Sequence, residues 1–496
     1  MIQRIAISPA LSRWGLFAAL FALVCVAPLP GRGAAPPPNI IFILADDLGW
    51  RDLACYGSPF YETPHLDQLA AQGLRFTQAY AACCVCSPTR ASILTGKYPA
   101  RLHLTDFLPG RGDRPDQKLK RPHFVDHLPL EEVTIAERLH EAGYRTAFLG
   151  KWHLGAAPFF PEHQGFDLNL GGCEKGQPPS YFSPYKIPNL PDGPPGEYLT
   201  DRLTDEALRF MDQAQKDGKP FFLYLSHYAV HNPQQAKPAL VEKYRAKLAR
   251  MPASGGPEFI TDSGRPVRQI QNRPIYAAMV ESLDESVGRV LDRLAELKLE
   301  QNTVVVFTSD NGGLATSEGT PTANVPLRMG KGWPYEGGVR EPLLVKWPGI
   351  TQPGSETAEL MISTDYFPTF LEMAGLSLPS PQSIDGLSLV PVLRGGKRPE
   401  RPLFWHYPQY SNQGGGPVGA IRWGDWKLLE WYEDMRVELY NLRDDVGEAH
   451  DLAGKYPDRV KTLRERLHAW RREMDAQMPT PNPDYRAAVT PEGTAR

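Results

Sequence analysis

The feature that most restricts the fold is a short apolar run that recurs along the chain. The run NIIFILA (39–45) is almost continuously apolar, as strands buried on both faces of a parallel sheet are, and the runs YRTAFLG (144–150), PFFLYLS (220–226) and TVVVFTS (303–309) are short strands rich in apolar residues. The last three follow amphipathic helical segments. Helices that alternate with buried strands form βαβ crossovers, so the sequence predicts an α/β fold in which helices sandwich a large, mainly parallel sheet.

The pattern changes at about residue 376. The segments RPLFWHYPQY, GAIRWGDWKLLEW and VELYNLRDD resemble shorter, partly alternating strands joined by turns, and a charged amphipathic helix follows over 456–475. We therefore expect a catalytic domain over 36–375, a smaller antiparallel α+β domain over 376–478 and a flexible tail over 479–496.

The first 35 residues have the pattern of a targeting segment. Arg4 and Arg13 precede the apolar run WGLFAALFALVCVAP, which is short for a bilayer span, and small residues follow it. A signal peptide over 1–35, cleaved near Ala34 or Ala35, predicts a secreted or periplasmic protein without stable membrane insertion. A membrane anchor is the alternative.

Net charge and cysteine content exclude some classes of partner and of metal site. A net charge of −3 gives no reason to expect nucleic acid or an anionic membrane as a partner. Removal of the signal peptide leaves an odd number of cysteines, so at least one is unpaired or has another use. These cysteines are Cys55, Cys83, Cys84, Cys86 and Cys173. Their spacing does not match a zinc site.

Polar side chains follow each of the four apolar runs. Open α/β sheets bind ligands beyond the carboxyl ends of their strands, so we expect these side chains to meet at one site. They are Asp46 and Asp47, Lys151 and His153, His231, and Asp310 with Asn311. Taken singly, each Asp or Asn is explained equally well as a cap or turn former. The oxygen ligands among them suit Ca²⁺ or Mg²⁺.

The stretch CVCSPTRASILTGKYP (84–99) contains signals for a helix start and stop. Ser87 fits the N-cap, Pro88 the first helical position and Gly96 the C-terminal stop, which places Cys86 just before the helix and Arg90 in its first turn. A thiol at a helix N-terminus ionises readily, although an inert buried cysteine explains it equally well. An oxygen-bearing group at position 86 would complete a hard-cation site better than sulfur.

The run from Cys86 to Arg90 resembles the Cys-x-Pro-x-Arg signature of formylglycine-dependent sulfatases, within the alkaline-phosphatase-like superfamily. The blocks ILADDLGW, GYRTAFLGKWHLG, SDNGG and GKGWPYEGGVREP also resemble that family's blocks, in its order. The resemblance extends over nearly the whole mature chain and implies a sulfuric ester hydrolase.

The resemblance implies that a maturation enzyme oxidises Cys86 to formylglycine, whose hydrate is the nucleophile. It further implies one divalent cation per chain, Ca²⁺ rather than Mg²⁺, held by Asp46, Asp47, Cys86, Asp310 and Asn311. The implied catalytic residues are Cys86, Arg90, Lys151, His153, His231 and Lys331. Arg90 steadies the hydrate, Lys151 and Lys331 neutralise the sulfate, His231 protonates the leaving alcohol, and His153 removes a proton from the hydrate. His227 is a competitor of His231, because Val230 stands where many relatives have proline.

The substrate is the least constrained expectation. Loops rich in Trp and Tyr favour a sulfated carbohydrate, with an aryl sulfate as the simpler possibility, bound by Lys151, His231, Lys331 and His406. Two other classes stay open: a phosphodiesterase or phosphonate monoester hydrolase on the same scaffold, and a non-catalytic protein that binds sulfated glycans.

Overall fold

The computed structural model describes residues 36–252, 255–380 and 382–486. Every helix and strand given below belongs to one compact unit, Pro37–Arg496. The predicted signal peptide and its cleavage site lie outside the described residues. Across those residues, no helix combines the length and apolar character that a bilayer crossing requires.

A nine-stranded sheet forms the centre of the unit. Its strands follow the order β11-β2-β10-β9-β1-β6-β4-β5, with β12 also paired to β2. Only β10 runs against its neighbours, so the sheet is mainly parallel. The strands are β1 (Asn39–Ala45), β2 (Leu74–Tyr80), β4 (Arg145–Gly150), β5 (Leu168–Leu170), β6 (Phe221–Ser226), β9 (Thr303–Ser309), β10 (Arg340–Lys346), β11 (Ser355–Thr357) and β12 (Met361–Ile362).

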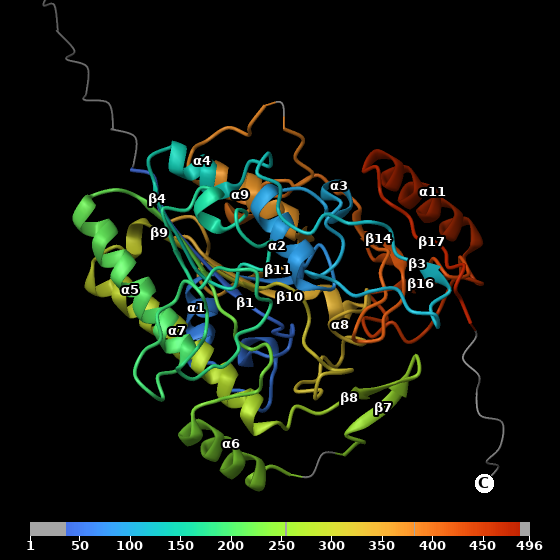
Figure 1. The fold of residues 1–496 in the computed structure, drawn as a ribbon, viewed down its shortest axis with the longest axis horizontal. Coiled ribbons are helices and arrows are strands. Elements are labelled where there is room, and N and C mark those ends of the chain that lie inside the picture. The colour runs from blue at the N-terminus through green and yellow to red at the C-terminus, as the bar shows by residue number, and fades with distance from the viewer. Residues whose placement is uncertain (1–35, 253–254, 381, 487–496) are drawn as a thin grey trace, which may run out of the picture. The chain divides into compact units, whose positions relative to one another are not determined.

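Helices cover both faces of this sheet (Figure 1). The layer on one face comprises α1 (Pro64–Gln72), α5 (Leu199–Asp217), α6 (Pro238–Arg250) and α7 (Pro274–Glu296). The layer on the other face comprises α2 (Cys86–Thr95), α4 (Ile135–Glu141), α9 (Tyr366–Met373) and α10 (Val390–Leu393). Two short helices, α3 (Pro99–Leu102) and α8 (Glu336–Val339), lie in connections.

The alternation of side chains along β1 explains why its run is continuously apolar. Ile41 and Ile43 pack into the α5–α7 layer, whereas Ile40 and Phe42 pack into the α2–α9 layer, and all four are fully buried. Burying one such side chain stabilises the fold by about 1.5–3 kcal/mol. The predicted α/β fold with a mainly parallel sheet between helices is confirmed.

A second sheet, which is antiparallel, follows in the chain. Its order is β13-β14-β15-β16, and α11 packs on β14 and β15 through Leu463, Leu467 and Trp470. The elements are β13 (Leu403–Tyr407), β14 (Val418–Trp423), β15 (Trp426–Trp431), β16 (Val437–Asn441) and α11 (Pro457–Glu473). This confirms an antiparallel C-terminal region, while the boundaries at 375 and 478 stay a prediction.

Small elements complete the unit. Two antiparallel pairs are the hairpin of β7 (Phe259–Asp262) with β8 (Arg265–Arg268), and the long-range pair of β3 (Leu119–Lys120) with β17 (Thr480–Pro481). The 3₁₀ helices are η1 (Ala54–Tyr56), η2 (Pro161–His163), η3 (Glu300–Asn302) and η4 (Ser363–Asp365). The predicted tail thus starts with a paired strand, β17, and the next residue, Asn482, donates hydrogen bonds to the carbonyls of Arg114 and Gln117. Residues 487–496 lie outside the description.

Candidate active site

The polar residues predicted from the strand ends meet at one edge of the large sheet. Strands β9, β1, β6 and β4 are consecutive neighbours in it. Each of the four is parallel to the next, so their carboxyl ends lie at the same edge. The side chains that follow them are buried.

Three carboxylates and one carboxamide form the centre of the site. The Asp47 backbone N–H donates to Asp310 Oδ1 at 3.2 Å, and Asn311 Nδ2 donates to Asp47 Oδ1 at 2.7 Å. Asp46, which directly precedes Asp47, is fully buried. The backbone φ of Asp47 is 61°, in the left-handed region that costs a non-glycine residue energy and is enriched at functional sites.

Three cationic side chains pair with these carboxylates. Lys151 Nζ lies 2.7 Å from Asp46 Oδ2, and Lys331 Nζ lies 2.7 Å from Asp47 Oδ1. Arg90 donates from Nε to Asp310 Oδ2 at 2.9 Å, with its Nη2 2.7 Å from the same oxygen. Its Nη1 donates to the carbonyl of Lys151 and to the hydroxyl of Ser226. Arg90 lies near residue 86, as the sequence predicts, and it also fixes the position of the Asp310 carboxylate.

Burial and neighbouring charge move the pKa values of these acids in opposite directions. Burial, reinforced by the charges of Asp310 and Asp47, raises the pKa of Asp46 well above its usual value despite Lys151. Burial also acts to raise the pKa of Asp47, but the charges of Lys331, His231 and Lys151 together outweigh it and the net pKa is lowered. Clustered carboxylates in a dry site repel one another, which is the electrostatic situation that a bound cation relieves.

The donor set fits a hard divalent cation. Asp46 Oδ1 and Asn311 Oδ1 are buried and have no hydrogen-bond partner among the described residues, so both oxygens are available as ligands. Ligand atoms of Asp46, Asp47 and His231 lie within 4.8 Å of one another. Carboxylate and amide oxygens are the ligands that Ca²⁺ and Mg²⁺ prefer. The sequence predicts His231 at this site but not among the ligands of the cation.

The helix that carries Cys86 starts earlier than the sequence predicts. Helix α2 begins at Cys86 with Val85 as its N-cap, so Ser87 is not the cap. The hydroxyl of Ser87 instead donates to the carbonyl of His153 at 2.9 Å, a tertiary contact that outcompetes local capping. The predicted stop is correct: Gly96 is the C-cap, with φ 71°.

Cys86 faces His153. The Sγ atom lies 3.2 Å from His153 Nδ1, and both residues are buried. His153 Nε2 donates to the carbonyl of Leu108 at 2.6 Å, which leaves Nδ1 as the unprotonated nitrogen of a neutral ring. Burial, aided by the charge of Lys151, lowers the pKa of His153 well below its usual value, so the ring is neutral at pH 7. Its φ of 58° is a second strained backbone position in the site.

A pocket of about 520 Å³ opens over Cys86, within the size range of small-molecule sites. His153, His231 and Lys331 also line it. The His231 ring donates from Nδ1 to the carbonyl of Asn232, and its Nε2 lies 3.5 Å from Asp47 Oδ2. The pKa of His231 is lowered to about 3, by burial first and then by Lys331.

The loop that carries Lys331 is held against the segment before α2. Gly332 donates from its N–H to the carbonyl of Cys84 at 2.8 Å, with a φ of 80° that favours glycine. His227, the competitor of His231, lies away from this pocket. It is fully buried and its Nε2 bonds to the hydroxyl of Ser286.

His406 does not reach the pocket, which corrects the sequence prediction. Its Nδ1 bonds to the hydroxyl of Tyr432 at 2.8 Å and its Nε2 donates to the carbonyl of Gln477 at 2.9 Å. The ring is buried in β13 of the second sheet, and both its nitrogens are used in packing that sheet.

Sequence reasoning missed several pocket residues. The carbonyl of Leu108 sets the His153 tautomer, and a backbone carbonyl has no sequence signature. Others come from loops outside the blocks that resemble the family, and their polar side chains are of types common at any protein surface. These are Arg111, Gln177, Glu318, Asn412 and Gln413.

All five cysteines in the described part of the chain are free thiols: Cys55, Cys83, Cys84, Cys86 and Cys173. The sequence left open whether they pair.

Comparisons with known proteins agree on one family. The family model Sulfatase matches residues 38–376, and the model N-sulphoglucosamine sulphohydrolase, C-terminal, matches residues 329–473. Human arylsulfatase A is 36% identical over 500 aligned positions, which cover 90% of each chain. The N-acetylgalactosamine-6-sulfatase of Sus scrofa is 36% identical over 90% of this chain and 81% of its own.

Solved structures show the same likeness. The crystal structure of Ps i-CgsB in complex with k-i-k-neocarrahexaose aligns with a TM-score of 0.72 at 29% identity, covering 91% of this chain and 94% of that chain. The resemblance first suggested by the Cys86–Arg90 motif thus extends to the sequence and the fold of nearly the whole chain. The chain belongs to the sulfatase family and is a sulfuric ester hydrolase.

Proposed function

We propose that this protein hydrolyses a sulfate ester of a carbohydrate at the Cys86 pocket, with formylglycine at position 86 and a bound Ca²⁺ ion. The observation that carries the proposal is the convergence of Cys86, His153, His231 and Lys331 on one pocket, beside a buried carboxylate and a buried carboxamide that each have an oxygen without a hydrogen-bond partner among the described residues. As formylglycine, residue 86 would supply a hydroxyl nucleophile through its hydrate.

The ligands of the cation would be Asp46, Asp47, Asp310, Asn311 and residue 86. The ring of His231 lies within the same cluster as the first two, and we assign it proton transfer instead of ligation, because a nitrogen that binds the cation cannot donate a proton. Bound there, Ca²⁺ would supply positive charge that polarises the sulfate oxygens and lowers the pKa of the attacking hydroxyl. The hard oxygen donors favour this ion class over zinc.

Two lysines bring positive charge to the sulfate. Lys331 lines the pocket, and its pKa is raised by Asp47 and Cys86 against the opposing effect of burial, so it is charged at pH 7. Lys151 is fully buried beside Asp46. Fixed positive charges in a dry site stabilise the charge that develops in the transition state. Arg90 forms an ion pair with Asp310 and thereby positions helix α2, which also carries residue 86, against the carboxylates.

Two histidines move protons. His153 presents its unprotonated Nδ1 at 3.2 Å from the residue-86 side chain, where it would accept a proton from that residue's hydroxyl. His231 would act on the leaving group, the alcohol that departs from the sulfate. The negative charge of a bound sulfate favours the protonated ring, which would donate its proton to the leaving oxygen.

The substrate class is supported by the relatives. Ps i-CgsB was solved with neocarrahexaose, and the porcine relative is named for N-acetylgalactosamine 6-sulfate. The pocket, at about 520 Å³, has room for a sugar ring. We keep phosphodiester or phosphonate monoester hydrolysis as the second candidate, because the same charges would stabilise a phosphoryl group.

The test compares three proteins on two substrates. Wild type should cleave a sulfate monoester faster than a phosphodiester of the same alcohol at equal concentration, and Cys86→Ala should lose this activity. Cys55→Ser, which changes a thiol outside the pocket, is the matched control. Dominant phosphodiester turnover, or full activity in Cys86→Ala, would contradict the proposal.

The formylglycine at residue 86 and the export of the protein are tested separately. Peptide mass spectrometry across residue 86 of the active protein should show the aldehyde form, made by a maturation enzyme of the host. N-terminal sequencing of the exported protein should start near residue 35, as a secreted or periplasmic location requires. An intact thiol in active protein would refute the formylglycine mechanism.

A further inference from the structure

We propose that a groove beside the catalytic pocket binds a second anionic group of the substrate. We name it the arginine groove; its defining side chains are Arg111, Arg114, Arg121, Arg265, Tyr410 and Asn412. The preferred substrate is then an acidic oligosaccharide with an anionic group on the sugar next to the one whose sulfate ester is cleaved. This inference rests on the proposed function and specifies its substrate.

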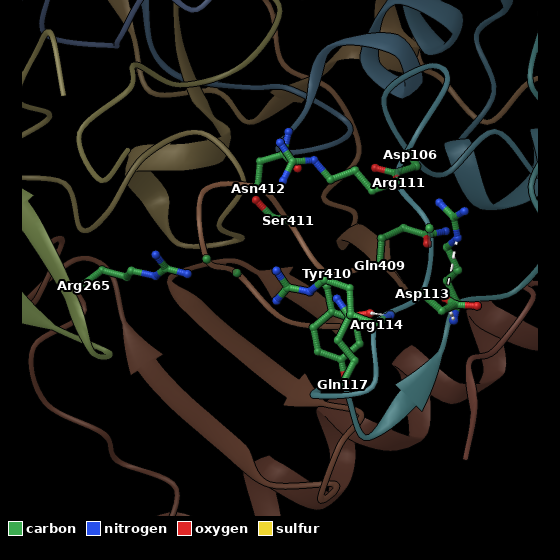
Figure 2. Close-up of a pocket in the computed structure, with 14 residues that line it drawn as sticks. Asp106, Arg111, Asp113, Arg114, Gln117, Arg265, Gln409, Tyr410, Ser411 and Asn412 are labelled. Carbon is green, nitrogen blue, oxygen red and sulfur yellow. Dashed lines mark hydrogen bonds and ion pairs between the residues drawn. The ribbon is translucent and has the colours of Figure 1, made fainter. Parts of the chain in front are cut away.

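The arginine groove is continuous with the catalytic pocket. Arg111 and Asn412 line both of them. Figure 2 shows the Arg111 side chain extending toward Asn412, on the loop of residues 409–415. A substrate with its sulfate ester over Cys86 would therefore place its neighbouring sugar at this junction.

Charge in the groove is net positive. Four arginines face two acids, and neither acid neutralises the groove fully. Asp113 is 3.7 Å from Arg121. Asp106 is buried and accepts from the Tyr407 hydroxyl, and burial raises its pKa to about 7.

Two of the arginines have no partner for their charge within the part of the chain that the structure describes. Among the described residues, no carboxylate lies within ion-pair distance of the guanidinium of Arg111 or Arg265, and no hydrogen bond from either guanidinium is present. Arg114, by contrast, is 3.1 Å from the exposed carboxylate of Asp116. A planar guanidinium has the geometry to bind a carboxylate or sulfate through two parallel hydrogen bonds.

The groove is assembled from three separate segments. Arg111 and Arg114 come from the loop before β3, Arg265 from β8, and Asn412 from the loop between β13 and β14. Figure 2 shows the Arg265 side chain directed from β8 toward that last loop. Gly414 permits this approach: a Cβ there would lie 2.4 Å from Arg265 Nε. The position of Arg265 thus depends on a residue without a side chain.

The size of the groove favours a small charged group over a whole sugar. Its volume of about 130 Å³ is well below the range of about 300–1,000 Å³ typical of ligand pockets. A neutral sugar would also leave the charges of Arg111 and Arg265 unused. A sulfate or carboxylate substituent matches both the volume and the charge.

The test uses Arg265, which lines the groove but not the catalytic pocket. Three sulfated disaccharides are compared, whose second sugar carries a carboxylate, a second sulfate or no charge. For Arg265→Gln we expect KM to rise about five- to tenfold on the charged substrates, as for loss of one charge-assisted contact, with kcat unchanged. KM on the neutral disaccharide and on a small aryl sulfate should stay at the wild-type value.

Three further variants sharpen the test. Arg265→Lys should raise KM on the charged substrates less than Arg265→Gln does, because an ammonium keeps the charge but cannot form the two parallel hydrogen bonds of a guanidinium. Gly414→Ala should reproduce the effect of Arg265→Gln without a change of charge. Arg245→Gln, which removes an exposed arginine on α6, should behave as wild type. The difference between charged and neutral substrates should shrink at high salt.

The outcomes separate the two proposals. Which of the two charged disaccharides responds more to Arg265→Gln identifies the anionic group. Equal effects of Arg265→Gln on charged and neutral disaccharides, or no effect on either, would overturn the arginine groove while leaving sulfatase activity intact. A wild-type protein that cleaves neither the disaccharides nor the aryl sulfate would overturn the proposed function itself.

Discussion

The Nδ1 atom of His153 lies 3.2 Å from the Sγ atom of Cys86, because hydrogen bonds fix both the ring and the backbone of His153. Its ring donates from Nε2 to the carbonyl of Leu108, and its own carbonyl accepts a hydrogen bond from the Ser87 hydroxyl. This arrangement directs one defined ring nitrogen at the residue that carries the proposed nucleophile.

His153→Ala should lower kcat for a small aryl sulfate by about 10²- to 10⁴-fold, the usual cost of removing a positioned general base. The thermal midpoint should change little by comparison, so the loss is chemical. Steady-state kinetics on matched protein preparations measure it. His140→Gln, a half-exposed histidine at the end of α4, serves as the control and should keep wild-type kcat. Near-normal turnover of His153→Ala would exclude the proposed base.

His231→Ala should affect substrates according to their leaving groups. An alkyl or sugar alcohol is a poor leaving group and needs a proton, so its hydrolysis should fall by about 10²-fold or more. A nitrophenyl sulfate, whose phenolate leaves without protonation, should lose far less. A series of aryl sulfates of increasing phenol pKa, analysed as log kcat against pKa, provides the measurement. A slope identical to that of wild type would refute the role of His231 as the acid.

Calcium should stabilise the folded protein. A ligand at 100 times its Kd adds about 2.7 kcal/mol to the free energy of unfolding, so the thermal midpoint of metal-stripped protein should rise on addition of Ca²⁺. Asn311→Ala removes the unpartnered Oδ1 and should reduce this rise. Asn302→Ala, at the opposite end of β9, should leave it unchanged. If Asn311→Ala showed the full rise, Asn311 would not be a ligand.

The stability of the protein should depend on pH through Glu448. Lys427 Nζ lies 2.9 Å from carboxylate oxygens of both Glu336 and Glu448, and all three side chains are fully buried. Burial, with the charge of Glu336, raises the pKa of Glu448 from 4.5 to about 7. The folded state therefore binds a proton that the unfolded state releases, and this stabilisation is lost as pH rises from 4.5 to about 7.

Glu448→Gln should remove this dependence. Its thermal midpoint should fall less between pH 5 and pH 8 than that of wild type, because the amide has no proton to lose. Glu465→Gln, an exposed residue of α11, is the control and should follow wild type. A wild-type midpoint that rises across this range relative to Glu448→Gln would contradict the assigned pKa direction.

Much of the fold was predictable because it depends on local patterns. The runs at 39–45, 144–150, 220–226 and 303–309 contain β1, β4, β6 and β9, since a high share of apolar residues is what burial on both faces of a sheet requires. The helix start at Ser87 was predicted wrongly, because its hydroxyl bonds to a carbonyl 66 residues away. Local capping rules contain no information about such a partner.

Local patterns were enough to predict which polar residues follow the parallel strands, and therefore which of them gather at one edge, because strand direction and strand ends are encoded locally. What these residues face depends on tertiary contacts. The contact of the Leu108 carbonyl with His153, the burial of His406 in the second sheet, and the placement of Arg111 and Arg265 in one groove all bring together segments distant in the chain. Such contacts depend on how whole layers pack, and packing is a property of the assembled chain.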